Sequence, residues 1–313
     1  MDSSRLDDAA RAGWLYYVAG NTQDQIATKL GVSRQSAQRL VSLAMAEGLV
    51  KVRIDHPIAQ CLALSRDLTA AYGLKFCEVT PSDPSSESTT LGVALATGAE
   101  LEKWLRKPEP GIIAMGTGRT LKAAVELLPA IDCPQHKVVS LTGNIAPDGS
   151  AAFYNVVFTM ADKVHSRSFP MPLPVIASSA KERETLHGQA LIKATLALAA
   201  DADVAFVGIG ELGRDAPLFV DGFLGKAELD ALHEAGAVGE IVGWAFDAKG
   251  ALVDGITNDR VASAPLPDPR RSLVIAAAMG KRKLPGIRAA IEGRLVNGLI
   301  TDEATATALL RAA

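Results

Sequence analysis

The sequence predicts an α/β protein in two parts: an N-terminal all-α helix-turn-helix domain and a mostly parallel, doubly wound sheet domain. Two short amphipathic helical patterns meet at Gly31, which predicts the first part. Beyond residue 57, short apolar strands alternate with helical patterns, which predicts a parallel sheet covered by helices. A chain of 313 residues, 48% of them hydrophobic, is long enough for both parts. We expect the helical domain at 1–55, a linker at 56–62 and the sheet domain at 63–313.

Charge is distributed unevenly along the chain. The formal net charge is −3, but segment 29–53 carries five cations and one anion, a local balance of +4. A basic face of this kind can bind phosphate whatever the net charge of the chain. Lys51 and Arg53, the last two of these cations, belong to a short β-like arm that we expect at 47–54.

The cysteines, the N-terminus and the apolar runs indicate a cytoplasmic protein. Three cysteines lie far apart without a CxxC pair, so neither disulfides nor a thiolate metal site is expected. The first residues lack the pattern of a signal peptide, and the most apolar stretches are too short to cross a bilayer. The five histidines are scattered without metal-ligand spacing, so we expect no metal and no membrane association.

Local signals predict helices in the first 47 residues. Apolar residues at nearly helical spacing predict the first helix: Leu6, Ala10, Leu15 and Val18. Thr22 followed by Gln25 is a capping box, so a second helix should begin there and bury Ile26, Ala27 and Leu30.

Gly31 is expected to form the turn, because glycine adopts a positive φ at little cost. Val32 should pack inward and Ser33 should cap a third helix. The apolar face of that helix is expected to contain Ala37, Leu40 and Val41.

The start of the third helix carries the residues that we expect to contact DNA. These outward-facing side chains are Ser33, Arg34, Gln35, Ser36 and Arg39. All can reach phosphates or base edges, and arginine and glutamine can make bidentate contacts to guanine and adenine. The alternative is a small helical domain that contacts another protein. The agreement between turn, caps and basic face favours DNA binding.

The remainder of the chain has the strand–helix alternation of a parallel sheet. Strands are expected at 76–82, 112–115, 136–144, 203–210, 240–247, 272–280 and the start of 295–310. Helices are expected at 89–107, from the glycine turn to 128, and at the end of 295–310, with a polar loop at 83–89.

Ligands of such sheets bind at the carboxyl ends of the strands, so the residues there are the candidates for a site. Gly116 and Gly118 let the backbone approach a ligand, Thr117 and Thr120 offer hydroxyls, and the next helix presents its N-terminal amides. This arrangement suits a phosphate or a polyol. The alternative is a tight strand-to-helix turn that requires glycine for its conformation alone.

Other polar residues at strand ends could complete this pocket: Asn144, Glu211, Asp247 and Lys283. Lys281 and Arg282 are expected in a solvated basic turn. The chain lacks a P-loop and a GxGxxG motif, which disfavours nucleoside triphosphates and dinucleotides. It also lacks GxSxG and HExxH, so hydrolase chemistry has no motif, and we predict no catalytic residue and no cofactor.

The order of these motifs resembles the SorC family of bacterial sugar-responsive transcriptional regulators along essentially the whole chain. The residues that carry the resemblance are QIATKLGVSRQSAQRLV, AMGTGRTL, SLTGNIAPDGSA, FPMPLPVIA, VGIG, GAVGEIVGWAFDAKG and LVNGLITDEATATALL. The resemblance implies an effector domain similar to ribose-5-phosphate isomerase and glucosamine-6-phosphate deaminase. It also implies a homotetramer, a dimer of dimers, that binds operator DNA and a sugar, a polyol or its phosphate.

The same resemblance implies an effector site made of the 116–120 loop with Asp247 and Lys283. Two residues depart from the common family pattern. Arg119 stands where many members have a smaller residue, and Met279 replaces a glycine. Arg119 could pair with an effector phosphate, or it could fill that space and favour an uncharged polyol. Whether the effector is phosphorylated stays open at this point.

We therefore expect a DNA-binding regulator of carbohydrate or polyol genes, with residues 63–313 as the effector and oligomerisation domain. The first alternative is a sugar-phosphate isomerase or deaminase with an appended helical domain, in which Asp247, Glu211 and Lys283 would act as acid or base. The second is a module that binds only protein partners. Resemblance at the level of fold does not by itself transfer catalysis, which favours the regulator.

Overall fold

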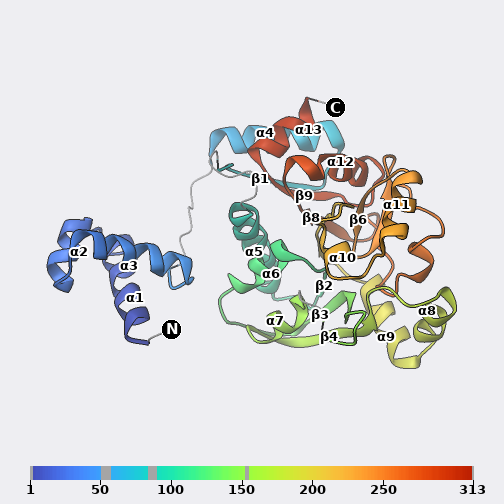
Figure 1. Cartoon of the computed structure of the whole chain (residues 1–313), viewed down its shortest axis with the longest axis horizontal. Coiled ribbons are helices and arrows are strands. Elements are labelled where there is room, and N and C mark those ends of the chain that lie inside the picture. Colours follow the sequence, from blue (N-terminus) through green and yellow to red (C-terminus); the bar gives the residue numbers. More distant parts are fainter. Residues whose placement is uncertain (1–2, 51–57, 84–89, 152–154, 312–313) are drawn as a thin grey trace. The chain divides into compact units, whose positions relative to one another are not determined.

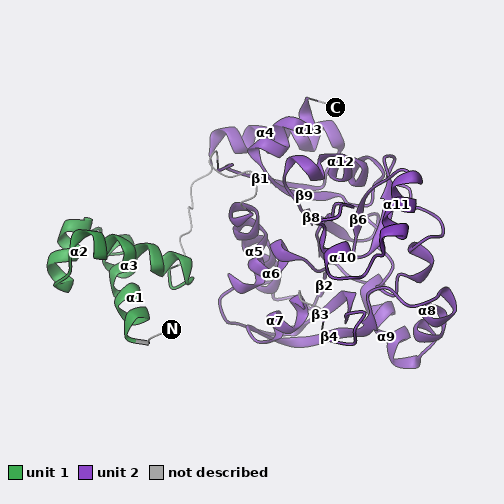
Figure 2. Ribbon diagram, viewed as in Figure 1, with its two compact units in different colours: residues 1–56 green, residues 57–313 purple. Residues whose placement is uncertain are grey.

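The computed structural model describes residues 3–50, 58–83, 90–151 and 155–311. The chain forms two compact units, residues 1–56 and 57–313, which are coloured separately in Figure 2. The second half of the arm expected at 47–54, with Lys51 and Arg53, lies outside the described residues, as does most of the 83–89 loop.

The first unit contains three helices, α1 (Ser3–Tyr17), α2 (Gln23–Leu30) and α3 (Arg34–Ala46). The expected capping box is present. The Thr22 hydroxyl accepts from the Gln25 N–H, and the Thr22 N–H donates to the Gln25 side chain at 2.8 Å. Gly31 has a φ of +67°, and Ser33 caps α3 by accepting from the Ser36 N–H at 3.1 Å. The local predictions for the turn and both caps are confirmed.

Two predictions about packing in this unit were wrong. Val32 is 36% exposed, not turned inward, and Val18 of the expected apolar face of α1 is 68% exposed. The buried face of α1 contains Ala9, Ala12 and Gly13. A Cβ on Gly13 would lie 3.0 Å from the Ala44 Cβ, so small residues let α1 approach α3 closely. Periodicity of large apolar residues does not detect a contact that depends on small ones.

The second unit is built on a seven-stranded parallel sheet (Figure 1), with the strand order β1-β9-β8-β5-β2-β3-β4. Its strands are β1 (Phe76–Thr80), β2 (Ile112–Met115), β3 (Ile131–Ile145), β4 (Val164–Pro174), β5 (Val204–Val207), β8 (Leu273–Ala277) and β9 (Gly298–Asp302). A separate antiparallel pair consists of β6 (Ala237–Ile241) and β7 (Trp244–Asp247).

Helices cover both faces of the sheet. One face packs against α4 (Ala59–Tyr72), α9 (Ala190–Ala200), α12 (Leu284–Glu292) and α13 (Glu303–Leu310), and the other against α5 (Leu91–Leu105), α6 (Arg119–Glu126) and α7 (Val156–Ala161). The further helices are α8 (Ala180–His187), α10 (Pro217–Val220) and α11 (Lys226–Glu234), with short 3-10 turns η1 (Asn258–Arg260) and η2 (Lys281–Lys283). The predicted fold class, a helical domain before a doubly wound parallel sheet, is confirmed.

Three expectations for this unit need correction. Segment 240–247, predicted as a strand of the main sheet, forms part of the β6–β7 hairpin. Residues 59–62, expected in the linker, lie in the first turn of α4. Strand β4 was not predicted, because prolines stand at 170, 172 and 174. Prolines at alternate positions remove the N–H groups of one edge only, which an edge strand tolerates.

Among the described residues, no helix is both long and apolar enough to span a membrane.

The contact between Gly250 and Gly293 provides a test of the packing beneath the hairpin. Gly250 has a φ of +76°, and a Cβ there would lie 2.5 Å from the Ala289 carbonyl oxygen of α12. Gly250→Ala should therefore lower the free energy of unfolding of the second unit by more than about 2 kcal/mol, since strain and overlap act together. Urea denaturation measures this. Gly213→Ala, with no atom within 4 Å of its Cβ, is the control, and an equal loss there would contradict the explanation.

Candidate functional site

The outer face of α3 is the candidate nucleic-acid interface. Its buried side consists of Ala37, Val41 and Ala44. Exposed side chains recur at helical spacing on the other side, at Gln35, Gln38, Arg39 and Ser42. All four can donate hydrogen bonds to phosphates or base edges. The Gln35 and Arg39 side chains have no hydrogen bond or ion pair with any residue that the structure describes.

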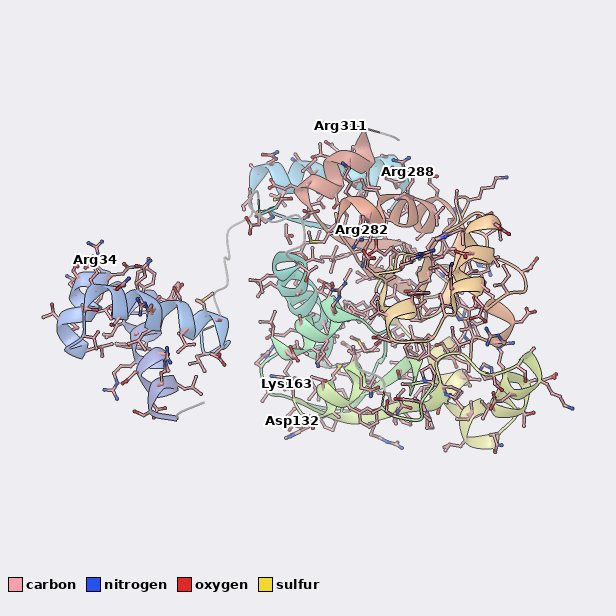
Figure 3. All side chains as sticks on the ribbon, viewed as in Figure 1. Arg34, Asp132, Lys163, Arg282, Arg288 and Arg311 are labelled. Atoms are coloured by element: carbon pink, nitrogen blue, oxygen red, sulfur yellow. The ribbon has the colours of Figure 1, made fainter. Side chains whose placement is uncertain are left out.

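The other three residues predicted to contact DNA have partners within the helical unit. The Ser33 hydroxyl accepts from the Ser36 N–H and lies 2.9 Å from the Ser36 hydroxyl, so both serve the helix cap. Arg34 projects outward from this unit in Figure 3, with its Nε 3.5 Å from a carboxylate oxygen of Asp24. Both side chains of this pair are about two-thirds exposed, so it contributes little stability and opens easily.

Sequence reasoning missed Gln38 and Ser42. The signal was available, because the buried residues of α3 follow a helical period and Gln38 and Ser42 lie on the opposite side. The prediction had instead chosen mainly consecutive residues at the start of the helix.

The carboxyl ends of β2 and β5 form the topological switch point of the sheet. These strands are neighbours, and the chain continues from β2 to β3 on one side and from β5 to β8 on the other. After β2, the Gly116 N–H donates to the Phe206 carbonyl of β5 at 2.8 Å. A Cβ on Gly208 would lie 3.3 Å from the Thr117 carbonyl oxygen. The two loops therefore lie side by side where sheets of this class bind ligands.

The rest of the predicted glycine loop leads into α6. Gly118 precedes the helix with a φ of +123°, a conformation that favours glycine. Arg119 is exposed, and Thr120 is half-buried in the first turn. The loop between β2 and α6 therefore lies at the carboxyl end of β2, where the site was expected.

Lys283, which follows β8 and η2, belongs to a cluster of charged side chains at this edge. Burial lowers the pKa of its ammonium group, and the carboxylates of Glu240 and Glu211 oppose that shift by favouring the charged form. Arg119 and Arg282 lower the pKa of Lys283 further by charge repulsion. The structure therefore brings three of the predicted effector residues together: Arg119, Glu211 and Lys283.

Arg282 is exposed, as expected, but it also makes two ion pairs. Its guanidinium lies 3.0 Å from the Glu211 carboxylate and 2.7 Å from that of Asp215, and Figure 3 labels it in the second unit. These contacts hold Glu211 near Lys283.

Glu240 is the functional candidate that sequence reasoning missed at this site. Its carboxylate accepts from the Gly243 N–H at 2.8 Å, and its backbone pairs with Gly210 through bonds of 2.9 and 3.0 Å. A Cβ on Gly210 would overlap this carboxylate, so a side chain there would displace Glu240. Burial raises the pKa of Glu240, and the Gly243 N–H and Lys283 oppose that rise. The sequence offered one signal, the glycine that ends the VGIG segment, Gly210. It did not show that Glu240 packs against this glycine.

The structure does not bring Asp247 to this cluster. Its carboxylate accepts from the Lys249 and Ala251 N–H groups and so closes the turn after β7. Gly250 in that turn packs against Gly293, at the C-terminal end of α12. Lys283 precedes the other end of a nine-residue helix, roughly 13 Å away along its axis. Glu240, not Asp247, is the acid beside Lys283.

The turn between β6 and β7 is strained and buried next to the glycine loop. Val242 has a φ of +47°, which is rare for a β-branched residue, and Gly243 has a φ of +92°. The Val242 side chain is 4% exposed, and its Cγ1 lies 3.2 Å from the position of a Cβ on Gly116. A side chain at Gly116 would therefore disturb this turn.

A narrow pocket lies on the other side of the glycine loop, at the carboxyl ends of β2, β3 and β4. It is lined by Gly116, Thr117, Ser140, Thr142, Gly143, Asn144, Asn155, Val156, Val157, Phe158, Pro170 and Met171. Asn144, a predicted effector residue, is one of them. The glycine loop thus borders a charged half around Lys283 and an uncharged half around Asn144.

Within the described part of the chain, no three histidine, cysteine or acidic side chains are grouped so that they could hold a metal ion. The chemistry of the site is that of hydrogen bonding and charge, which suits a hydroxylated or phosphorylated small molecule.

The raised pKa of Glu240 predicts a pH-dependent stability. The pKa of this carboxyl is higher in the folded chain than its ordinary value of 4.5. The folded state therefore loses stability relative to the unfolded state as the pH rises above 4.5. Glu240→Gln cannot ionise. Its free energy of unfolding should therefore increase relative to the parent chain as the pH rises above 4.5.

Urea denaturation at a series of pH values measures this difference. The control is Glu234→Gln, which alters an exposed glutamate of α11. A constant offset between Glu240→Gln and the parent chain across this range would contradict the assignment.

Comparison with known proteins agrees with this architecture. Residues 56–311 match the family model described as "Putative sugar-binding domain". The chain is 34% identical over 303 residues to the erythritol catabolism regulatory protein EryD of Brucella abortus, covering 96% of each. It is 32% identical over 314 residues to the transcriptional regulator LsrR of an Enterobacter species, covering 96% of this chain and 92% of that protein.

A solved structure extends the likeness to the whole chain. The full-length sorbitol operon regulator SorC from Klebsiella pneumoniae superposes with a TM-score of 0.71 at 28% identity, covering 98% of this chain and all of that one. These relatives are named regulators, not enzymes, so the isomerase alternative is not favoured. The chain belongs to the SorC family of sugar-binding transcriptional regulators.

Proposed function

We propose that this regulator controls genes of polyol catabolism by binding operator DNA through α3 and a small polyol, or its phosphate, at the switch point. Support for the effector class comes from two relatives whose names refer to polyols, erythritol for EryD and sorbitol for SorC. The observation that carries the proposal is the site at the strand ends, where charged and uncharged polar groups meet around one glycine loop.

For the DNA contacts, we propose the exposed face of α3 together with the residues at its start. The set comprises Ser33, Arg34, Gln35, Ser36, Gln38, Arg39 and Ser42, of which Ser33 and Ser36 serve mainly in the helix cap. Recognition of a two-fold operator needs two such helices about one DNA turn apart, or a multiple of it. A cytoplasmic homotetramer, as a dimer of dimers, would supply them.

For the effector, we propose contacts from Gly116, Thr117, Thr120, Asn144 and Lys283, with Arg119, Glu211 and Glu240 setting the charge at one end. Effector binding would favour one arrangement of the subunits over another, and DNA would change effector affinity by the same factor. A coupling free energy of about 1–3 kcal/mol is enough to change operator occupancy between severalfold and a hundredfold.

The DNA proposal is tested by Arg34→Ala combined with Arg39→Ala. Each phosphate contact contributes about 0.9 to the slope of log K against log salt, so the slope should fall by up to about 1.8 for each bound helix. Fluorescence anisotropy on a duplex selected from random DNA measures this. Arg271→Ala, which removes an exposed arginine of the second unit, is the control. Unchanged salt dependence in the double variant would exclude these contacts.

The effector proposal is tested with erythritol and erythritol 4-phosphate. A ligand at 100 times its dissociation constant adds about 2.7 kcal/mol to the unfolding free energy, which a thermal-shift assay detects. Lys283→Ala should lose this stabilisation and the ligand-dependent change in DNA affinity, while the duplex still binds. Lys281→Ala is a matched control, because that lysine lies two residues away and is exposed. Equal losses in both variants would count against a site at Lys283.

A further inference from the structure

The uncharged half of the pocket contains buried polar atoms that lack a partner. Thr142 is 4% exposed, and its hydroxyl makes no hydrogen bond among the described residues. The Asn144 Oδ1 atom is also buried without a hydrogen-bond partner in that part of the chain. Both residues line the same pocket. Buried polar atoms in native proteins nearly always have partners, so a bound hydroxyl group, from a ligand or a water molecule, can supply the missing bonds in this pocket.

The irregular course of β3 directs these two side chains into the pocket. Val139 pairs with Phe169 and Gly143 with Met171, so four residues of β3 advance against two of β4. The Ser140 hydroxyl stabilises this bulge by donating to the Thr142 carbonyl at 2.9 Å and accepting from the Thr142 N–H at 3.3 Å. Bulges next to ligand sites commonly redirect a side chain in this way.

Gly143 keeps the bulge tight. A Cβ there would lie 2.4 Å from the Pro174 carbonyl oxygen and 2.6 Å from that of Leu173. The strand passes so close to β4 at this point that only glycine fits. The positions of Thr142 and Asn144 on either side of it are therefore built into the backbone.

The chemistry of the unpartnered atoms selects a hydroxyl. The Oδ1 atom of asparagine only accepts, and a threonine hydroxyl can donate and accept. A fully ionised phosphate offers only acceptors, so it cannot satisfy the Asn144 oxygen, whereas a ligand hydroxyl can satisfy both residues. All the residues lining this pocket are uncharged, unlike the half around Lys283.

We propose that Thr142 and Asn144 form a hydroxyl-recognition subsite that determines which polyol the regulator accepts. This inference rests on the proposed function, because it assigns an orientation to the effector. The hydroxyl-bearing carbons lie toward β3, and any anionic group lies toward Lys283. The two ends of the site lie at β3 and β8, which are separated by three strand spacings in the order β3-β2-β5-β8. Their backbones are therefore roughly 14 Å apart, and the side chains that reach inward shorten this distance.

The test uses the full chain with erythritol and two triols that each lack one of its hydroxyls, butane-1,2,3-triol and butane-1,2,4-triol. Thr142→Val keeps the shape and removes the hydroxyl, and should weaken erythritol binding roughly tenfold in calorimetric titration. One of the two triols lacks the hydroxyl that contacts Thr142, and it should bind the parent chain about tenfold more weakly than erythritol does. Its affinity should not fall further in Thr142→Val, because that contact is already absent.

Asn144 is tested with two variants that differ in their acceptor atoms. Asn144→Leu should weaken erythritol binding, whereas Asn144→Asp keeps an oxygen acceptor and should retain more of it. Asn144→Asp should also discriminate against erythritol 4-phosphate, because it adds a negative charge to the pocket.

Ser168→Ala is the matched control. Ser168, on β4, also has a buried hydroxyl without a partner among the described residues, but it does not line the pocket. Its removal should leave erythritol affinity unchanged. Thermal unfolding of every variant shows whether the chain remains folded.

Three further outcomes would overturn the subsite. If Thr142→Val and Asn144→Leu bind erythritol within twofold of the parent chain while Lys283→Ala does not bind, the subsite is wrong and the proposed function stands. If Ser168→Ala loses as much affinity as Thr142→Val, the effect is one of packing. If the parent chain itself binds neither the polyols nor the phosphate, the proposed effector class fails together with the subsite.

Discussion

The antiparallel pairing of Gly210 with Glu240 joins the β6–β7 hairpin to the end of β5, and the candidate effector site depends on it. The two backbone bonds of 2.9 and 3.0 Å hold the hairpin above the carboxyl edge of the parallel sheet. They bring the Glu240 carboxylate beside Lys283 and the Val242 side chain against Gly116. Glycine at 210 leaves room for the Glu240 carboxylate, and a side chain there would displace it. The hairpin therefore supplies the Glu240 carboxylate beside Lys283 and packs against the glycine loop of the site.

The strain in this hairpin is compatible with that role. A β-branched residue in a left-handed conformation persists only where the surrounding structure holds it there. Burial of Val242 and the bond from the Gly243 N–H to Glu240 provide that constraint. The glycine loop of β2 packs against the same turn, so the loop and the hairpin are in direct contact.

The two halves of the site differ in the kind of group that they can satisfy. Around Lys283, acidic and basic side chains are nearly equal in number. A ligand that displaces water from these charged groups must offer them a charge or several hydroxyls in return. Beneath α7, the side chains that line the pocket are uncharged, and Thr142 and Asn144 carry buried polar atoms that make no hydrogen bond among the described residues. A hydroxylated chain with or without a phosphate has groups that suit both environments.

Features that depend on neighbouring residues were predictable from the sequence alone. Thr22 with Gln25, Gly31, and Ser33 set the boundaries of the helices, because capping bonds and positive φ values involve only a few adjacent residues. The alternation of strands and helices likewise determined the fold class, since helices on both faces are the usual way to bury a parallel sheet. The glycine loop at 116–120 followed from its place at a strand end.

Contacts between distant segments could be decided only by the tertiary structure. The sequence alone does not distinguish the roles of Asp247 and Glu240, which are both carboxylates of segment 237–247. The register of β6 and β7 directs Glu240 to Lys283 and leaves Asp247 in a turn. The bulge that directs Thr142 depends on how β3 pairs with β4, and the close approach of α1 to α3 depends on Gly13 meeting Ala44. Sequence by itself determined the helices, strands and strand-end loops of this regulator. The tertiary structure decided which polar groups meet, because pairing register and close packing are properties of two segments, not one.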